Sequence, residues 1–91
     1  DLAKPVVTIK CNTSGNPWLK WDAISGAQKY EVYRATSKDG TYKLVKTTVT
    51  ATSIADKTAS AGKTYYYKVM AIHSNTSANS AYSSIKYITA K

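Results

Sequence analysis

Polar and apolar residues alternate along residues 62–72, the most regular segment of the chain. The sequence there, Gly-Lys-Thr-Tyr-Tyr-Tyr-Lys-Val-Met-Ala-Ile, places Tyr65, Tyr67, Val69 and Ala71 on one side. Side chains two residues apart share one face of a β-strand. The segment is therefore predicted to be a strand in a sheet that is buried on one face.

The rest of the chain repeats this pattern in shorter segments separated by turn-forming residues. Further strands are predicted at residues 6–11, 18–22, 28–35, 42–48, 52–55 and 82–90. The segment Ser37-Lys38-Asp39-Gly40 is predicted to form a hairpin turn in which Gly40 adopts a positive φ. No window of 11 residues has apolar residues at helical spacing. The pattern predicts an all-β fold with seven strands.

Composition indicates how such a sheet protein fills its core. The chain has 91 residues, the size of one small domain, with eight Tyr, two Trp and no Phe. Large rings with polar edges suit strands that are buried on one side and wet on the other. The predicted core residues are Trp21, Tyr30, Val32, Tyr65, Tyr67 and Val69.

Several short patterns occur together in a fixed order. They are Trp21-Asp22-Ala23, Gly26-Ala27, Tyr30-x-Val32-x-Arg34, Gly40-x-Tyr42, Asp56 and Gly62-x-x-Tyr65-x-Tyr67-x-Val69-x-Ala71. This set resembles fibronectin type III domains, and most closely those repeated in large secreted and surface-attached bacterial proteins. The resemblance implies a seven-stranded, immunoglobulin-like antiparallel β-sandwich. It also implies that Trp21 is the core Trp of the second strand. Tyr65 is then the corner tyrosine, with its hydroxyl bonded to backbone near Ala59.

The opening Asp-Leu-Ala-Lys-Pro segment has the character of a linker. We expect residues 1–5 to be a linker and residues 6–91 to be the domain, cut from a longer protein. No run of 18 apolar residues is present, so no membrane span is predicted. Pro5 and the lysines of the fourth strand disfavour pairing at the sheet edges, and we expect a monomer.

Residues that carry chemistry are few and scattered. Cys11 and His73 are single, which excludes a disulfide within the chain and a Cys/His metal site by count. The acidic residues are Asp1, Asp22, Glu31, Asp39 and Asp56. None of them forms a pair in sequence that could perform acid-base chemistry. We expect no catalysis, no cofactor and no metal. Cys11 is expected to be a small buried residue and Asp56 to form an Asx turn or to contact nearby backbone amides.

Charge is the first candidate binding feature. Thirteen basic and five acidic residues give a net charge of +8. If the third, fourth, sixth and seventh strands form one sheet, its outer face is expected to collect Lys29, Lys43, Lys68 and Lys86. A basic face attracts anionic polymers. Nucleic acid is not an expected partner, because the basic residues are spread along the chain without a recognition element.

Exposed aromatic rings are the second candidate feature. Alternation points Tyr33 and Tyr66 outward on that sheet, beside Met70, and sends Trp18 to the outer side of the opposite sheet or to its rim. The candidate binding residues are Tyr33, Tyr66, Lys68, Lys29 and Trp18. Such rings could stack on the sugars of a polysaccharide or of an anionic cell-wall polymer. Alternatively, the lysine stems only cover the tyrosine rings and stabilise the sheet.

Taken together, these features predict a non-catalytic spacer or interaction module. The parent is expected to be a larger extracellular or cell-surface bacterial protein, such as a carbohydrate-active enzyme or an adhesin. Neighbouring domains of that chain are the expected partners. The alternative is a module that binds carbohydrate or cell wall through the outward Tyr and Lys residues.

Overall fold

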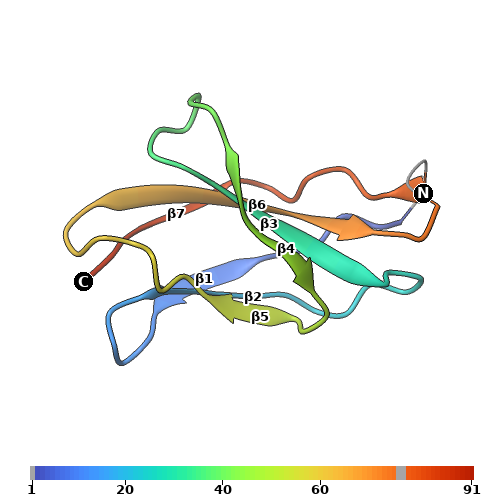
Figure 1. Cartoon of the computed structure of the whole chain (residues 1–91), viewed down its shortest axis with the longest axis horizontal. Coiled ribbons are helices and arrows are strands. Elements are labelled where there is room, and N and C mark those ends of the chain that lie inside the picture. Colours follow the sequence, from blue (N-terminus) through green and yellow to red (C-terminus); the bar gives the residue numbers. More distant parts are fainter. Residues whose placement is uncertain (1, 76–77) are drawn as a thin grey trace.

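The computed structural model describes residues 2–75 and 78–91, which form two antiparallel sheets (Figure 1). The strands are β1 (Thr8–Cys11), β2 (Pro17–Lys20), β3 (Lys29–Ala35), β4 (Lys43–Val49), β5 (Ser53–Ala55), β6 (Thr64–Ile72) and β7 (Lys86–Thr89). One sheet has the order β1-β2-β5 and the other the order β4-β3-β6-β7. The predicted all-β sandwich with seven strands is confirmed.

The last strand is shorter than predicted because the chain pairs irregularly with β6 before β7 begins. The Ser83 hydroxyl accepts a hydrogen bond from Val69 N at 2.9 Å, and the Ser80 hydroxyl accepts one from Ala71 N at 2.8 Å. In return, Ser83 N and Ser80 N donate to the carbonyls of Val69 and Ala71. Residues 80–83 therefore follow β6 through serine side chains, and the regular ladder starts only at Lys86.

The core lies between the two sheets and contains all the residues for which the alternation predicted burial. Trp21, Tyr30, Val32, Tyr65, Tyr67 and Val69 are each at most 4% exposed. The rings of Trp21 and Tyr30 meet edge to face, with centroids 5.4 Å apart. Burial of several such side chains is worth about 1.5–3 kcal/mol each, which is large against a net stability of about 5–15 kcal/mol.

The hydroxyl groups of the core tyrosines bind loops. The Tyr65 hydroxyl accepts a hydrogen bond from Ser60 N at 2.8 Å, one residue beyond the position that the resemblance implied. The Tyr30 hydroxyl accepts one from Ile24 N at 2.9 Å. Each ring therefore fills the core while its polar edge satisfies a backbone amide.

A buried carboxylate joins the two sheets. Asp56 follows β5 and is 2% exposed. Its Oδ2 accepts from Arg34 Nη1 at 2.8 Å and from the Tyr67 hydroxyl at 2.6 Å, both on the four-stranded sheet. Its Oδ1 accepts from the Thr58 amide at 3.1 Å and from the Thr58 hydroxyl at 2.6 Å. The Thr58 contact is the predicted Asx turn, whereas the ion pair to Arg34 was not predicted.

These bonds decide the charge state of Asp56. Burial alone would raise the pKa of its carboxyl, but the hydrogen bonds from Thr58, Tyr67 and Arg34 together lower that pKa below its ordinary value. Burial, followed by the bond to Asp56, raises the pKa of the Tyr67 hydroxyl. Asp56 is therefore an ionised, fully hydrogen-bonded group inside the fold.

Two local predictions were wrong. Gly40 does not have a positive φ, which among the described glycines occurs at Gly15, Gly26 and Gly62. The predicted turn does form, with Gly40 N donating to Ser37 O at 3.1 Å, but a Cβ at Gly40 would lie 2.5 Å from Ser37 Oγ. A side chain at this position would require the Ser37 hydroxyl to move. Cys11 is only partly buried, and its Sγ lies 3.4 Å from Thr89 O.

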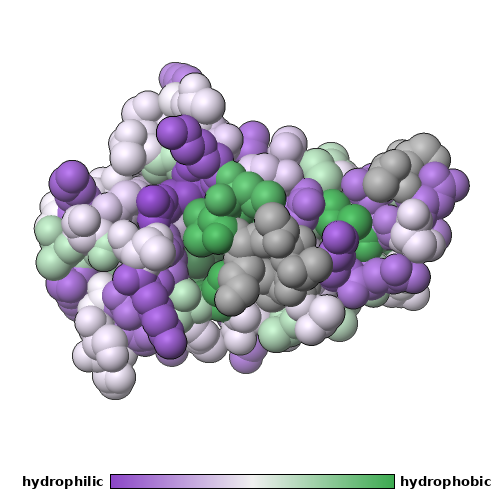
Figure 2. Space-filling model, in the orientation of Figure 1, coloured by the Kyte–Doolittle hydropathy of each residue, from purple (hydrophilic) through white to green (hydrophobic). Residues whose placement is uncertain are grey.

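The domain is elongated, measuring 38 × 27 × 18 Å, and the chain enters and leaves it at opposite ends of the long axis (Figure 1). Near the entry, Pro5 is fully buried and Leu2 N donates to Ala78 O at 2.9 Å. The division into a linker of residues 1–5 and a domain of residues 6–91 stays a prediction. Figure 2 shows mainly hydrophilic side chains on one face, with a hydrophobic group near its middle. Within the described residues, no helix is long and apolar enough to cross a membrane.

Candidate functional site

Five tyrosines gather on the outer face of the four-stranded sheet, around one lysine. We call this group of Tyr33, Tyr42, Tyr66, Tyr82, Tyr87 and Lys68 the tyrosine face. Strand register brings its members together, because Tyr33 on β3 pairs with Lys68 on β6 and Tyr66 pairs with Tyr87 on β7. Residues paired in this way point to the same side of a sheet.

The segment before β7 delivers Tyr82 to this face. Ser80 and Ser83 are buried and hydrogen-bonded to β6, while Tyr82 between them is 39% exposed. Its ring meets the Tyr33 ring edge to face, with centroids 5.3 Å apart. The two serines thus fix the backbone and leave Tyr82 outside.

The rings of Tyr66 and Tyr87 form the most open part of the face. They are stacked, with centroids 5.5 Å apart and planes inclined by 30°. Tyr87 is 67% exposed, and neighbouring Ile85 is 37% exposed. An exposed group of large apolar side chains is typical of a surface that contacts a ligand or another protein.

Lys68 lies between two rings of the face. Its Nζ is 3.8 Å from the centroid of Tyr82 and 4.4 Å from that of Tyr42. Cation-π contacts of this kind stabilise by about 0.5–1 kcal/mol at exposed sites. This is the packing role that the sequence left open as the alternative to binding. The ammonium group of Lys68 is thus partly covered by these two rings.

Hydrogen bonds hold two further rings of the face in place. The Tyr33 hydroxyl donates to Glu31 at 2.8 Å, and the Tyr42 hydroxyl donates to Lys38 O at 2.9 Å. Burial, then the contact with Glu31, raises the pKa of Tyr33. Burial, then the charge of Asp39, raises the pKa of the Tyr42 hydroxyl. Both phenols are therefore neutral, and their hydrogen bonds fix the orientation of the two rings.

The structure separates the candidate residues into two groups. Tyr33, Tyr66 and Lys68 lie together on the tyrosine face. Lys29 begins β3 and pairs with Ile72, at the other end of the strand. Trp18 is on the other sheet, where the Nζ of Lys10 lies 5.1 Å from the centroid of its ring. Lys29 and Trp18 therefore do not extend the tyrosine face.

Two of the lysines expected on the outer face point the other way. Lys43 pairs with Arg34, the partner of buried Asp56, and Lys86 pairs with buried Tyr67. Both lie on the inner side of their strands, at the rim. The register of β3 against β4 shifts on either side of Val32, and alternation within one strand cannot reveal such a shift.

Comparison with solved structures identifies the fold family. The chain superposes on an Fn3-like protein from Clostridium thermocellum with a TM-score of 0.83 and 32% sequence identity. The match covers 94% of this chain and 90% of that one. The chain belongs to the fibronectin type III-like (Fn3-like) family. No family model matches the sequence.

The Fn3-like domain also matches small parts of two long enzymes. It is 29% identical over 75 residues to an amylopullulanase of Thermoanaerobacterium saccharolyticum, and the match covers 79% of the domain and 6% of that protein. It is 30% identical over 70 residues to an amylopullulanase of Thermoanaerobacter thermohydrosulfuricus, and the match covers 76% of the domain and 5% of that protein. The domain thus resembles a short region of each enzyme.

Three residues of the tyrosine face were missed as site residues from the sequence of this Fn3-like domain. They are Tyr42, Tyr82 and Tyr87. Tyr87 had a usable signal, because Ile88 packs against the core and its neighbour must then point outward. Tyr82 had none, because its orientation depends on the serine contacts to β6. Within residues 2–75 and 78–91, no three His, Cys, Asp or Glu side chains gather as a metal site would require.

Proposed function

We propose that the Fn3-like domain is a non-catalytic spacer and interaction module of a larger secreted or surface-attached bacterial protein. The parent is a polysaccharide-acting enzyme of the amylopullulanase kind, and the partners of the module are the neighbouring domains of that chain. The match to a short region of two amylopullulanases supports this parent.

The observation that carries the proposal is the position of the two chain ends. They lie at opposite ends of the 38 Å axis, so domains joined in series extend in one direction (Figure 1). The bonds from Arg34 and Tyr67 to Asp56 tie one sheet to the other. An elongated unit with bonded sheets holds the domains before and after it apart.

Small-angle X-ray scattering on one copy and on two directly joined copies tests the spacer proposal. The expected result is a maximum dimension that nearly doubles in the joined pair, with an unchanged melting temperature. A pair that folds back to the dimension of a side-by-side dimer would contradict it. Release of sugar from pullulan or starch by the single domain would contradict the non-catalytic assignment.

A second function, carbohydrate or cell-wall binding, is favoured by the stacked Tyr66 and Tyr87 rings. Tyr87 is 67% exposed, more than packing of the sheet requires. Because Lys68 is covered by Tyr42 and Tyr82, we propose a neutral polysaccharide as the ligand, in preference to an anionic wall polymer. The apolar faces of sugar rings suit exposed aromatic rings.

A retention experiment tests this function. The domain is mixed with insoluble starch or with purified Gram-positive cell walls, each at low and at high salt. Ring stacking predicts retention that survives high salt, since salt screens charge and leaves apolar contact intact. Retention that salt abolishes would reflect only the net charge of +8. Absence of retention in both conditions would leave the spacer function alone.

A further inference from the structure

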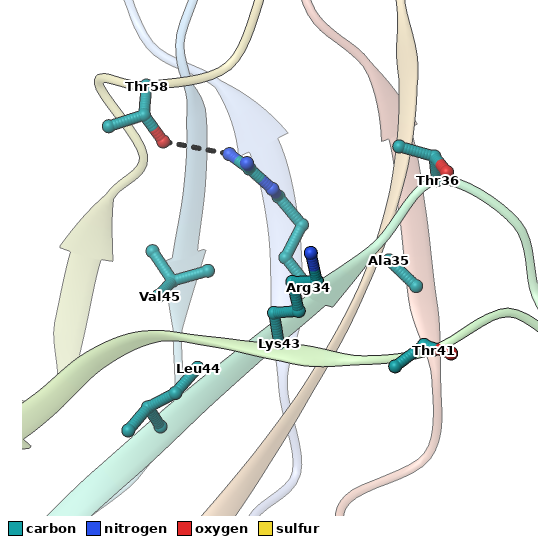
Figure 3. A pocket seen from close by; sticks show the side chains of 8 residues that line it. All are labelled: Arg34, Ala35, Thr36, Thr41, Lys43, Leu44, Val45 and Thr58. Carbon is teal, nitrogen blue, oxygen red and sulfur yellow. Dashed lines mark hydrogen bonds between the residues drawn. The ribbon is translucent and has the colours of Figure 1, made fainter.

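A hollow of about 370 Å³ opens at the β4 side of the sandwich, and neither Tyr66 nor Tyr87 lines it. It lies between β3, β4 and the loop that follows β5 (Figure 3). Its polar lining consists of Arg34, Thr36, Thr41, Lys43 and Thr58. Ligand sites commonly have volumes of about 300–1,000 Å³, so the hollow has room for one small molecule.

Arg34 is held rigidly at one wall of this hollow. Its Nη1 donates to Asp56 and to Thr58, at 2.8 Å in each case. The guanidinium carbon lies 4.8 Å from the ring centroid of Tyr65. Nη1 is thus fully used in hydrogen bonds within the domain, and the Arg34 side chain is still 28% exposed. The remaining N–H groups of a planar guanidinium form a fork that matches an oxyanion.

Lys43 places a second positive charge next to Arg34. The two residues are cross-strand partners, and Figure 3 shows both side chains extending to the same side of the β3–β4 pair. Asp56 is buried with both oxygens hydrogen-bonded. Among the described residues, no carboxylate forms an ion pair with Lys43, so the hollow carries an uncompensated positive charge.

We propose that this hollow binds a small acidic sugar. The carboxylate lies between the Lys43 ammonium and the free edge of the Arg34 guanidinium, and the sugar hydroxyls meet the threonine hydroxyls of the lining. Charge-assisted bonds supply the attraction, and the fixed position of Arg34 lowers the entropic cost of forming them. The site depends neither on the spacer function nor on the tyrosine face.

Titration of the ¹⁵N-labelled 91-residue chain, followed by NMR, tests the proposal. Glucuronate is the probe, glucose is its neutral match, acetate supplies the carboxylate alone, and sulfate reports binding of any anion. The expected result is saturable shifts with glucuronate, confined to the amides of the hollow, with weaker shifts from acetate and none from glucose. Equal responses to sulfate and glucuronate, or shifts spread over all the lysines, would overturn the proposal.

A pair of charge-matched variants locates the effect. Lys43→Gln removes an exposed ammonium, and we expect it to weaken glucuronate binding at least fivefold with an unchanged melting temperature. Lys20→Gln removes an exposed charge from the opposite sheet and is expected to leave binding unaltered. Equal losses in both variants would show attraction by net charge only, and would overturn a site at the hollow.

Discussion

Two groups of tyrosines occupy opposite sides of the same sheet and do different work. Tyr30, Tyr65 and Tyr67 are at most 4% exposed, and each hydroxyl bonds a loop amide or Asp56. On the outer side, Tyr66 and Tyr87 contact each other, and Tyr87 is largely exposed. Tyr65 and Tyr66 are neighbours in the sequence, so the strand period of two alone separates a residue of the fold from a candidate for binding.

The largest loss of folding stability should come from removal of an aromatic ring from the core. Trp21→Ala deletes a side chain that is 2% exposed and packs on Tyr30. Such truncations cost about 3–5 kcal/mol, which is comparable with the whole stability of a marginal domain. We expect a domain that is unfolded or nearly so in thermal and urea melts. A melting temperature lowered by only a degree or two would contradict the core assignment.

Removal of the buried charge should come next. Asp56→Asn keeps the size of the side chain but leaves Arg34 without its ion pair. Loss of one partner of a buried pair costs about 3–5 kcal/mol, and because Arg34 is partly exposed we expect about 2–3 kcal/mol. Urea denaturation measures the change. Thr8→Ala, which truncates an exposed side chain on β1, is the control and should stay within about 0.5 kcal/mol.

The same carboxylate predicts a pH dependence. The pKa of Asp56 is lowered in the folded domain. The ionised carboxylate therefore makes its full contribution to folding stability above the pKa of an unfolded Asp, about 3.9. The contribution is then lost as the pH falls through the lower, folded value. Melting temperatures between pH 7 and pH 2.5 should decline more steeply for the natural domain than for Asp56→Asn. Parallel curves would show that Asp56 is not the group responsible.

Features that depend on a single strand, such as which of its residues are buried, could be predicted from the sequence. The alternation along residues 62–72 correctly assigned Tyr65, Tyr67 and Val69 to the core, since period and burial are local properties. Lys43 was misplaced because β4 pairs with β3 through a register shift, which one strand alone does not reveal. Lys86 was misplaced although it lies two residues from Ile88 and therefore shares its inner side. The ion pair of Arg34 with Asp56 joins residues 22 positions apart, on different sheets, and no local pattern encodes it. Tyr82 of the tyrosine face was missed for the same reason, because its orientation depends on the bonds of Ser80 and Ser83 to β6.

The smallest effect on stability should come from substitutions on the outer side of the sheet. These substitutions test binding. Tyr66→Ala and Tyr87→Ala each remove one ring of the stacked pair, and we expect the melting temperature to change little. Retention on polysaccharide should nevertheless be lost if these rings bind sugar.

Tyr67→Ala is the matched inner variant, and it should unfold the domain because it empties a core site and leaves Asp56 short of a donor. Collapse of the melt for Tyr66→Ala would place that ring in the core and remove the main support for binding. A normal melt with normal retention would assign the tyrosine face to packing by Lys68 and its rings.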